Sequence, residues 1–289
     1  MRNRSRRSLL HVCFLSLAMV AAPSVLMANH SWNGYHWGRT ANPFTLKLGN
    51  NLSSVWQQYL GNTSSDWSKS SVLDTTIVAG QANPRNCRPT AGRDEVCNAT
   101  YGNTGWLGVA QIWVSGSHIT QGTVKLNDTY FNTAKYNTFA WREMVTCQEV
   151  GHTLGLDHQD TNFNNTNLGT CMDYTNDPTG TAGTNGTLAN TSPNQHDYDE
   201  LVTIYSHLDT TNTVFAIPSV SAFVTLPPPA AGDDGGNGPA DWGIEVRRSA
   251  DGHVSVFERE LGPGERLFTF VIWADRRAGF ASVSNSRDN

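Results

Sequence analysis

Charged side chains are scarce in this sequence, and lysine is the scarcest of the basic ones. Asp, Glu, Lys and Arg make up 16% of its 289 residues, whereas about a quarter is usual in globular proteins. Lysine occurs only at positions 47, 69, 125 and 135. The formal net charge of −5 falls to −9 if the arginine-rich first seven residues are removed. We therefore expect no nucleic-acid partner, because phosphate backbones are bound by clustered cations.

Long apolar runs are absent after residue 28. Before that point, basic residues at 2–7 precede an apolar run at 9–20 and the small residue Ala28, an order typical of a cleaved export signal. We expect residues 1–28 to be a signal peptide, with a membrane anchor as the alternative. The pair Arg6-Arg7 leaves twin-arginine export open beside the general route. The expected product is a secreted or periplasmic monomer with no membrane contact.

The chain also lacks any two cysteines separated by two residues, which argues against a cysteine-based zinc site. Cys13 lies in the expected signal peptide, so Cys87, Cys97, Cys147 and Cys171 remain, an even number for an oxidising compartment. Four cysteines allow three connectivities. We prefer Cys87–Cys97 with Cys147–Cys171, because the first closes a short polar loop, a closure that stabilises by about 3 kcal/mol.

Composition divides the mature chain near residue 225. A proline-rich and then glycine-rich stretch at 226–241 predicts a linker. Residues 29–225 mix predicted strands and helices in one larger domain. Residues 242–289 show short alternating strands at 243–248, 253–260 and 266–273, which predict a small β meander that must pack on something to be stable.

Hydrophobic periodicity predicts the elements of the larger region. Strands are expected at 44–48, 74–79, 106–114 and 122–126. Helices are expected at 52–60 ending at Gly61, at 138–154 capped by Asn137 or Thr138, and after Ser192. For the last helix, Ser192 is the expected cap, Pro193 the first residue and Gln195 the partner in a capping box.

The clearest chemical pattern lies at the end of the 138–154 helix. Gln148 and His152 are four residues apart and therefore share one face of that helix. Gly155 permits a turn with positive φ, which lets His158 return toward the same face. Glu149 lies beside this face, where it can hold a water molecule.

This pattern resembles that of the metzincin zinc endopeptidases, H-E-x-x-H-x-x-G-x-x-H followed by a Met-turn. The agreement covers roughly residues 30–210 and is closest to the matrixin-like members. Gln148 departs from it, because the family has a zinc-binding histidine there. A methionine followed two residues later by a tyrosine is closer to the astacin and serralysin branches. The matching residues are Glu149, His152, Gly155, His158, Met172 and Tyr174.

The resemblance implies an α+β fold, with a twisted, mostly parallel sheet that has one antiparallel edge strand and packs over long helices. It also implies zinc-dependent hydrolysis of peptide bonds in an extended protein or peptide substrate that pairs with the 105–114 edge strand. The implied zinc ligands are Gln148, His152 and His158. Glu149 would be the general base toward a zinc-activated water, and Tyr174 a donor to the oxyanion. The Cys147–Cys171 bridge would tie the Met-turn to the helix.

Alternatives remain open at this stage. An amide oxygen is a weaker zinc ligand than an imidazole, so a catalytically weak or dead peptide-binding module is the main alternative, and a zinc amidase for cell-wall peptides is another. His118 or Tyr174 could replace Gln148 in the metal shell. Ca²⁺ is a weaker expectation, because only the opening of a calcium loop is present, at Asp160, Asn162 and Asn164.

Overall fold

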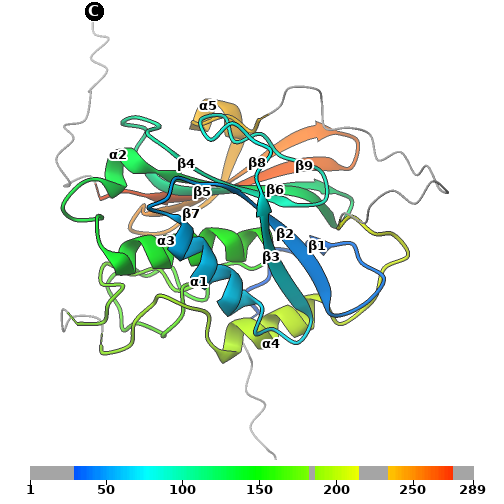
Figure 1. Cartoon of the computed structure of the whole chain (residues 1–289), viewed down its shortest axis with the longest axis horizontal. Helices are drawn as coiled ribbons and strands as arrows, with labels where there is room; N and C mark the ends of the chain where they lie inside the picture. The colour runs from blue at the N-terminus through cyan, green and yellow to red at the C-terminus, as the bar shows by residue number, and fades with distance from the viewer. Residues whose placement is uncertain (1–28, 182–185, 215–233, 276–289) are drawn as a thin grey trace, which may run out of the picture.

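The computed structural model describes residues 29–181, 186–214 and 234–275. The expected signal peptide and the first half of the expected linker lie outside these residues. The described part forms a mixed α/β structure with one large sheet and few helices (Figure 1). No described helix is long and apolar enough to cross a membrane.

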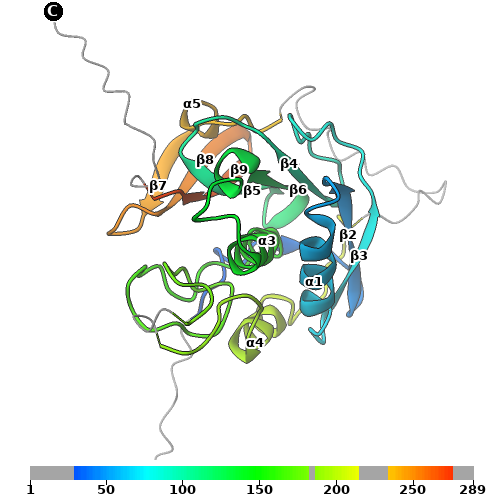
Figure 2. The same cartoon turned by 60° about the vertical axis from the view of Figure 1, so that its left-hand side comes forward.

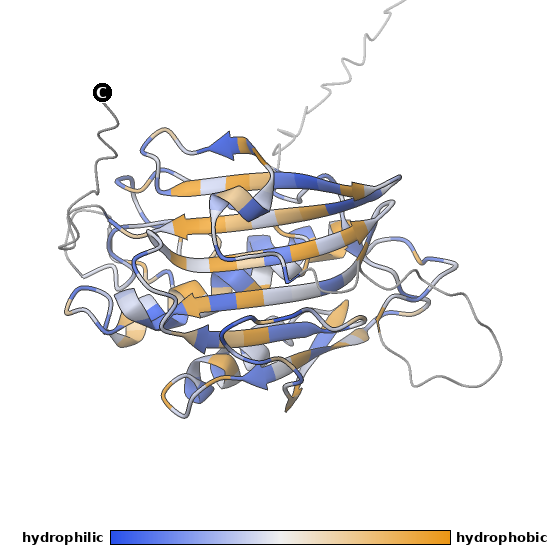
Figure 3. Cartoon of the chain, turned by 90° about the horizontal axis from the view of Figure 1, so that it is seen from above, coloured by the Kyte–Doolittle hydropathy of each residue, from blue (hydrophilic) through white to orange (hydrophobic). Residues whose placement is uncertain are grey.

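Nine strands in the described residues form this sheet. Their order is β3-β2-β4-β6-β5-β9-β8-β7, and β1 pairs separately with β6. Figure 3 shows the strands of the sheet side by side. The first four strands of this order pair in parallel, whereas β5, β9, β8 and β7 pair antiparallel. The bounds are β1 His36–Trp37, β2 Phe44–Asn51, β3 Leu73–Ala79, β4 Asp94–Ala99, β5 Trp106–Ser115, β6 His118–Asn127, β7 Ile244–Arg248, β8 Val254–Gly262 and β9 Glu265–Trp273.

The helices α1, α3 and α4 lie on one face of the sheet, and α3 lies between the sheet and α4 (Figure 2). Residues 140–153 of α3 are all buried, because α1 and the sheet cover it from different sides. The short α5 packs on the opposite face, where Trp242 contributes to a smaller apolar cluster with Trp106 and Phe257. The bounds are α1 Gln57–Trp67, α2 Asp128–Phe131, α3 Phe139–Thr153, α4 Gln195–Ile204 and α5 Pro239–Trp242.

The C-terminal strands are part of this fold. β9 pairs with β5 from Ser115↔Glu265 to Trp106↔Trp273. Phe268, Phe270 and Ile272 of β9 belong to the same apolar core as the helices. The expectation that β5 is the antiparallel edge strand is therefore wrong. The C-terminal meander pairs with β5 through β9 and so extends the sheet beyond it.

Several predicted boundaries differ from the observed ones. The first helix passes through Gly61 and ends at Trp67, because the Trp67 indole is fully buried and donates to the carbonyl of Cys147 (3.1 Å). β4 was not predicted, and β6 begins four residues earlier than expected.

The cap of the last helix also lies elsewhere. Asn194 caps α4, and its side chain accepts from the amides of His196 and Asp197 while Asp197 accepts from the Asn194 amide. The Ser192 cap and the Gln195 capping box are therefore wrong. Ser192 instead accepts a backbone hydrogen bond from Cys171 (3.0 Å).

Both preferred disulfides are present. Cys87 is bonded to Cys97 and Cys147 to Cys171, each with Cα atoms 5.9 Å apart. Two disulfides are typical of a protein from an oxidising compartment.

Candidate metal centre

The helix α3 carries the motif residues into the core. Thr138 caps it by accepting from the Trp141 amide. At its other end Gly155 has a φ of +94°, and a Cβ there would lie 2.2 Å from the carbonyl oxygen of Tyr35. Only glycine fits this turn, because other residues meet both backbone strain and a backbone collision. The turn brings His158 back to α3.

The two histidines of the motif lie against each other. Their ring centroids are 4.5 Å apart. His152 donates from Nδ1 to the carbonyl of Leu156 (2.9 Å), which leaves its Nε2 lone pair directed elsewhere. That Nε2 and the Nε2 of His158 are buried without a hydrogen-bond partner among the described residues, whereas His158 Nδ1 lies 3.5 Å from Asp157 Oδ1.

Gln148 presents an amide oxygen from the same helix. Its Nε2 donates to the carbonyl of Cys171 (2.6 Å), which fixes the orientation of the amide. Its Oε1 is buried and has no hydrogen-bond partner in the described part of the chain. Because unpaired buried polar atoms are costly, these orphaned oxygen and nitrogen atoms indicate a missing ligand.

Glu149 lies toward the sheet. A Cβ on Gly108 of β5 would lie 2.4 Å from its Oε1, so the absence of a side chain at 108 makes room for the carboxylate. Neither oxygen makes a well-aligned hydrogen bond within the described residues. Burial raises the pKa of Glu149 well above its usual value, and the nearby Ala110 amide offsets this only in part. A raised pKa is typical of carboxyl groups that take up and release protons in catalysis.

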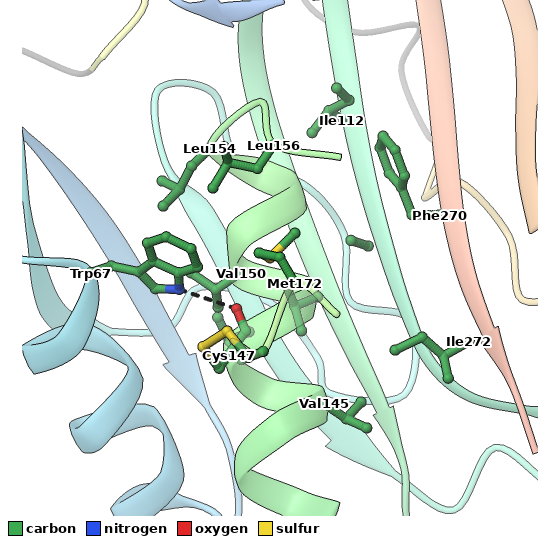
Figure 4. Close-up of a cluster of buried hydrophobic side chains, with 14 of the residues drawn as sticks. Trp67, Ile112, Val145, Cys147, Val150, Leu154, Leu156, Met172, Phe270 and Ile272 are labelled. Carbon is green, nitrogen blue, oxygen red and sulfur yellow. Dashed lines mark hydrogen bonds between the residues drawn. A yellow bond between two sulfur atoms is a disulfide. The ribbon is translucent and has the colours of Figure 1, made fainter. Parts of the chain in front are cut away.

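Met172 lies under the helix at Gly151. A Cβ on Gly151 would be 2.5 Å from the Met172 Sδ atom, so the glycine allows this close approach. Figure 4 shows Met172 beside α3 together with Cys147 and Val150. The Cys147–Cys171 bridge fixes the residue before Met172 to the residue before Gln148.

The C-terminal strands cover this centre. The Phe270 ring of β9 stacks on the His152 imidazole, with centroids 4.5 Å apart and planes 6° apart. The Tyr174 hydroxyl donates to the carbonyl of Trp273 (3.2 Å). Arg247 of β7 makes two hydrogen bonds to Asp157.

These contacts leave every motif side chain inaccessible. Gln148, Glu149 and His152 have no exposed surface, and His158 is 7% exposed. Burial lowers the pKa of both histidines, which favours the neutral rings that bind metals.

The arrangement fits a zinc ion in its donor set. Two imidazole nitrogens and one amide oxygen are N and O ligands of the kind that zinc accepts, and three protein ligands leave a position for water.

Other candidate residues lie away from this centre. The Nε2 atom of His118 is 3.1 Å from Asp209, in a group of histidines that the sequence did not link, because its members come from distant segments. Asp160 accepts from the Asn162 amide and from Asn165. Both carboxylate oxygens of Asp160 accept hydrogen bonds from neighbouring residues. The structure therefore adds no support for a Ca²⁺ site there.

No family model matches this chain, and a search of curated proteins finds no similar protein.

Proposed function

We propose that this chain is an exported zinc metalloendopeptidase whose catalytic centre is held closed by its own C-terminal strands. The observation that carries the proposal is that Gln148, His152 and His158 each hold a buried atom that could bind a metal and has no hydrogen-bond partner in the described residues. The buried carboxylate of Glu149 follows Gln148 on the same helix. Buried polar atoms without partners are uncommon in a structural core and call for an explanation such as a missing ligand.

Each residue has a distinct task in this proposal. Gln148 Oε1, His152 Nε2 and one nitrogen of His158 would hold zinc, which supplies Lewis-acid activation of a water and a carbonyl. Glu149 takes the proton of the attacking water and delivers it to the leaving amine. Tyr174 donates to the oxyanion once its hydroxyl leaves the Trp273 carbonyl.

The strand β5 supports the choice of an extended peptide as substrate. Its partner β9 is itself an extended, antiparallel segment that pairs along almost the whole strand. If β9 moves away, β5 gains a free edge of backbone donors and acceptors, which is the surface that an added peptide strand uses. β9 therefore occupies the place that we assign to substrate.

A peptide-binding module without catalysis is the second candidate. It is favoured by the amide at position 148 and by the completeness of the β5–β9 pairing. The two candidates share the peptide site, but only the enzyme needs the proton transfer of Glu149.

The test uses the full zinc-loaded chain in a variant whose C-terminal strands are held less tightly over the α3 centre. Arg247→Ala removes the ion pair with Asp157, and its cleavage of unfolded casein is compared with that of Arg247→Ala/Glu149→Ala. The proposal expects cleavage in the first variant and a loss of about 10²–10⁴-fold in the second, with zinc retained in both.

The control is Arg248→Ala, because Arg248 lies in the same strand but pairs with Glu245. Equal cleavage by the two Arg247 variants would exclude Glu149 as the base. Peptide binding without any cleavage, in folded and zinc-loaded protein, would establish the binding module instead.

A further inference from the structure

A second group of metal-ligating side chains lies outside the α3 centre. Three histidine Nε2 atoms surround one oxygen, Asp209 Oδ1, at 3.4 Å (His36), 3.1 Å (His118) and 3.4 Å (His207). The Nε2 atoms of His36 and His207 are 3.2 Å apart. His36 is buried, Asp209 and His118 are partly buried, and the His207 side chain is half exposed.

The separations among His36, His207 and Asp209 match the edge of a small coordination tetrahedron. Zinc binds imidazole nitrogen and carboxylate oxygen at about 2.0–2.1 Å, so tetrahedral ligand atoms lie roughly 3.3–3.4 Å from one another. The donor atoms of these three residues all lie within 4.8 Å of one another, and His118 is not part of that group.

The local sheet explains how His36 and His118 come to lie beside each other. β1 pairs with β6 in the register His36↔His118, so the two side chains leave neighbouring strands at the same level. Their ring centroids are 5.0 Å apart. His207 and Asp209 follow α4, and this segment is held to β1 by backbone hydrogen bonds from Asp209 to Arg39 and from Thr213 to Gly38.

The surrounding hydrogen bonds orient the donors. His36 donates from Nδ1 to the carbonyl of Gly34 (2.7 Å), so the neutral ring directs the Nε2 lone pair at Asp209. Two lone pairs facing each other repel unless a cation lies between them. Arg39 binds the other oxygen, Asp209 Oδ2, through Nη1 (2.6 Å) and its backbone amide (3.2 Å), which leaves Oδ1 for the histidines. Hydrogen bonds that orient the ligand side chains in this way are typical of metal sites.

We infer that His36, His207 and Asp209 form a second zinc site, with His118 hydrogen-bonded to Asp209 beside it. Three protein ligands and a water molecule complete a tetrahedral shell. The ion would join β1 to the segment after α4. This inference does not depend on the proposed peptidase activity.

The test counts metal in a chain from which the α3 centre has been removed. His158→Ala is prepared metal-free and titrated with Zn²⁺, and separately with Co²⁺, whose visible absorption reports tetrahedral geometry. We expect one tight equivalent, a tetrahedral cobalt spectrum, and a higher melting temperature with zinc.

Adding His207→Ala removes one ligand at a half-exposed position, so folding is least at risk. We expect affinity to fall at least about 100-fold, because even the loss of an outer contact costs about 10–100-fold. Asp209→Asn should weaken binding as well. His253→Ala is the matched control, since His253 lies beside Asp251 without further histidines (3.5 Å).

The possible outcomes distinguish a failure of the second zinc site from a failure of the α3 centre. Absence of zinc binding by His158→Ala, or equal binding after His207→Ala is added, would leave a purely hydrogen-bonded cluster and overturn the inference. If the wild type binds no more zinc than His158→Ala does, the α3 centre fails while the second site stands.

Discussion

The Phe270 ring lies flat on the imidazole of His152, and the two residues are 118 positions apart in the chain. Phe270 pairs with Ala110 in the register of β9 and β5, so the strand pairing itself brings the ring to the motif helix. A strand that stabilises the fold therefore also closes the centre. We therefore expect substitutions at different positions of the C-terminal strands to have separate effects on access to the α3 centre and on the stability of the fold.

Phe270→Ala should open the centre. The variant loses the ring that covers His152, so we expect casein cleavage to rise at least about tenfold, together with a stability loss of about 3–5 kcal/mol for a buried phenylalanine. Phe257→Ala is the control, because Phe257 lies in β8 and packs on Trp242 on the other face of the sheet. A rise in activity in both variants would mean that general loosening, not exposure of His152, controls cleavage.

The sequence predicted the local parts of this centre because they depend on neighbouring residues. The spacing of Gln148 and His152 defines a helix face, and Gly155 supplies the turn whatever lies around it. The sequence did not predict that β9 covers this centre, because the pairing of β5 with β9 depends on the fit of two strands whose paired residues lie 150 to 167 positions apart. The predicted meander contained all three strands but no information on its partner.

The cap of α4 shows the same limit at shorter range. Ser192 and Asn194 are both good caps in isolation. Asn194 is used because its side chain reaches two amides and Asp197 returns the contact, while the backbone of Ser192 is engaged by Cys171. Tertiary contacts therefore select Asn194 over Ser192, although both residues are suitable helix caps by local criteria.

The role of Gln148 can be tested through metal affinity. In a His207→Ala background, which removes one ligand of the second zinc site, Gln148→Ala should lose zinc to a fluorescent chelator, because two histidines and water hold it weakly. Gln148→His should bind more tightly, since imidazole is a stronger ligand than an amide oxygen. If Gln148→Ala keeps its zinc, Gln148 is not a ligand and another residue completes the shell.

The turn at Gly155 should be unusually sensitive. Gly155→Ala combines a φ of +94° with a Cβ 2.2 Å from the Tyr35 carbonyl oxygen, so we expect a loss of about 3 kcal/mol or more in the free energy of unfolding. Gly102→Ala is the matched control: its φ is +87° and a Cβ there meets nothing within 4 Å. The control should lose only about 1–2 kcal/mol, the cost of the left-handed backbone. Equal losses would show that the collision with Tyr35 is relieved.

Asp94 should make stability depend on pH. This carboxyl at the start of β4 is fully buried, and burial raises its pKa to about 7, although the Thr153 hydroxyl donates to it (2.8 Å) and partly opposes the shift. The folded state thus holds a proton that the unfolded chain releases near pH 4. The stabilisation is fully present below that pH and is lost as the pH rises through about 7.

Asp94→Asn removes this titration while keeping a side chain of similar shape. We expect the variant and the wild type to have similar free energies of unfolding at pH 4, and the variant to be more stable at pH 8 by on the order of 2–4 kcal/mol. Urea unfolding at pH 4, 6 and 8 measures the difference directly. A difference that stays constant across this range would show that Asp94 does not hold a proton in the folded state, and that a water or a rearranged partner compensates for its charge.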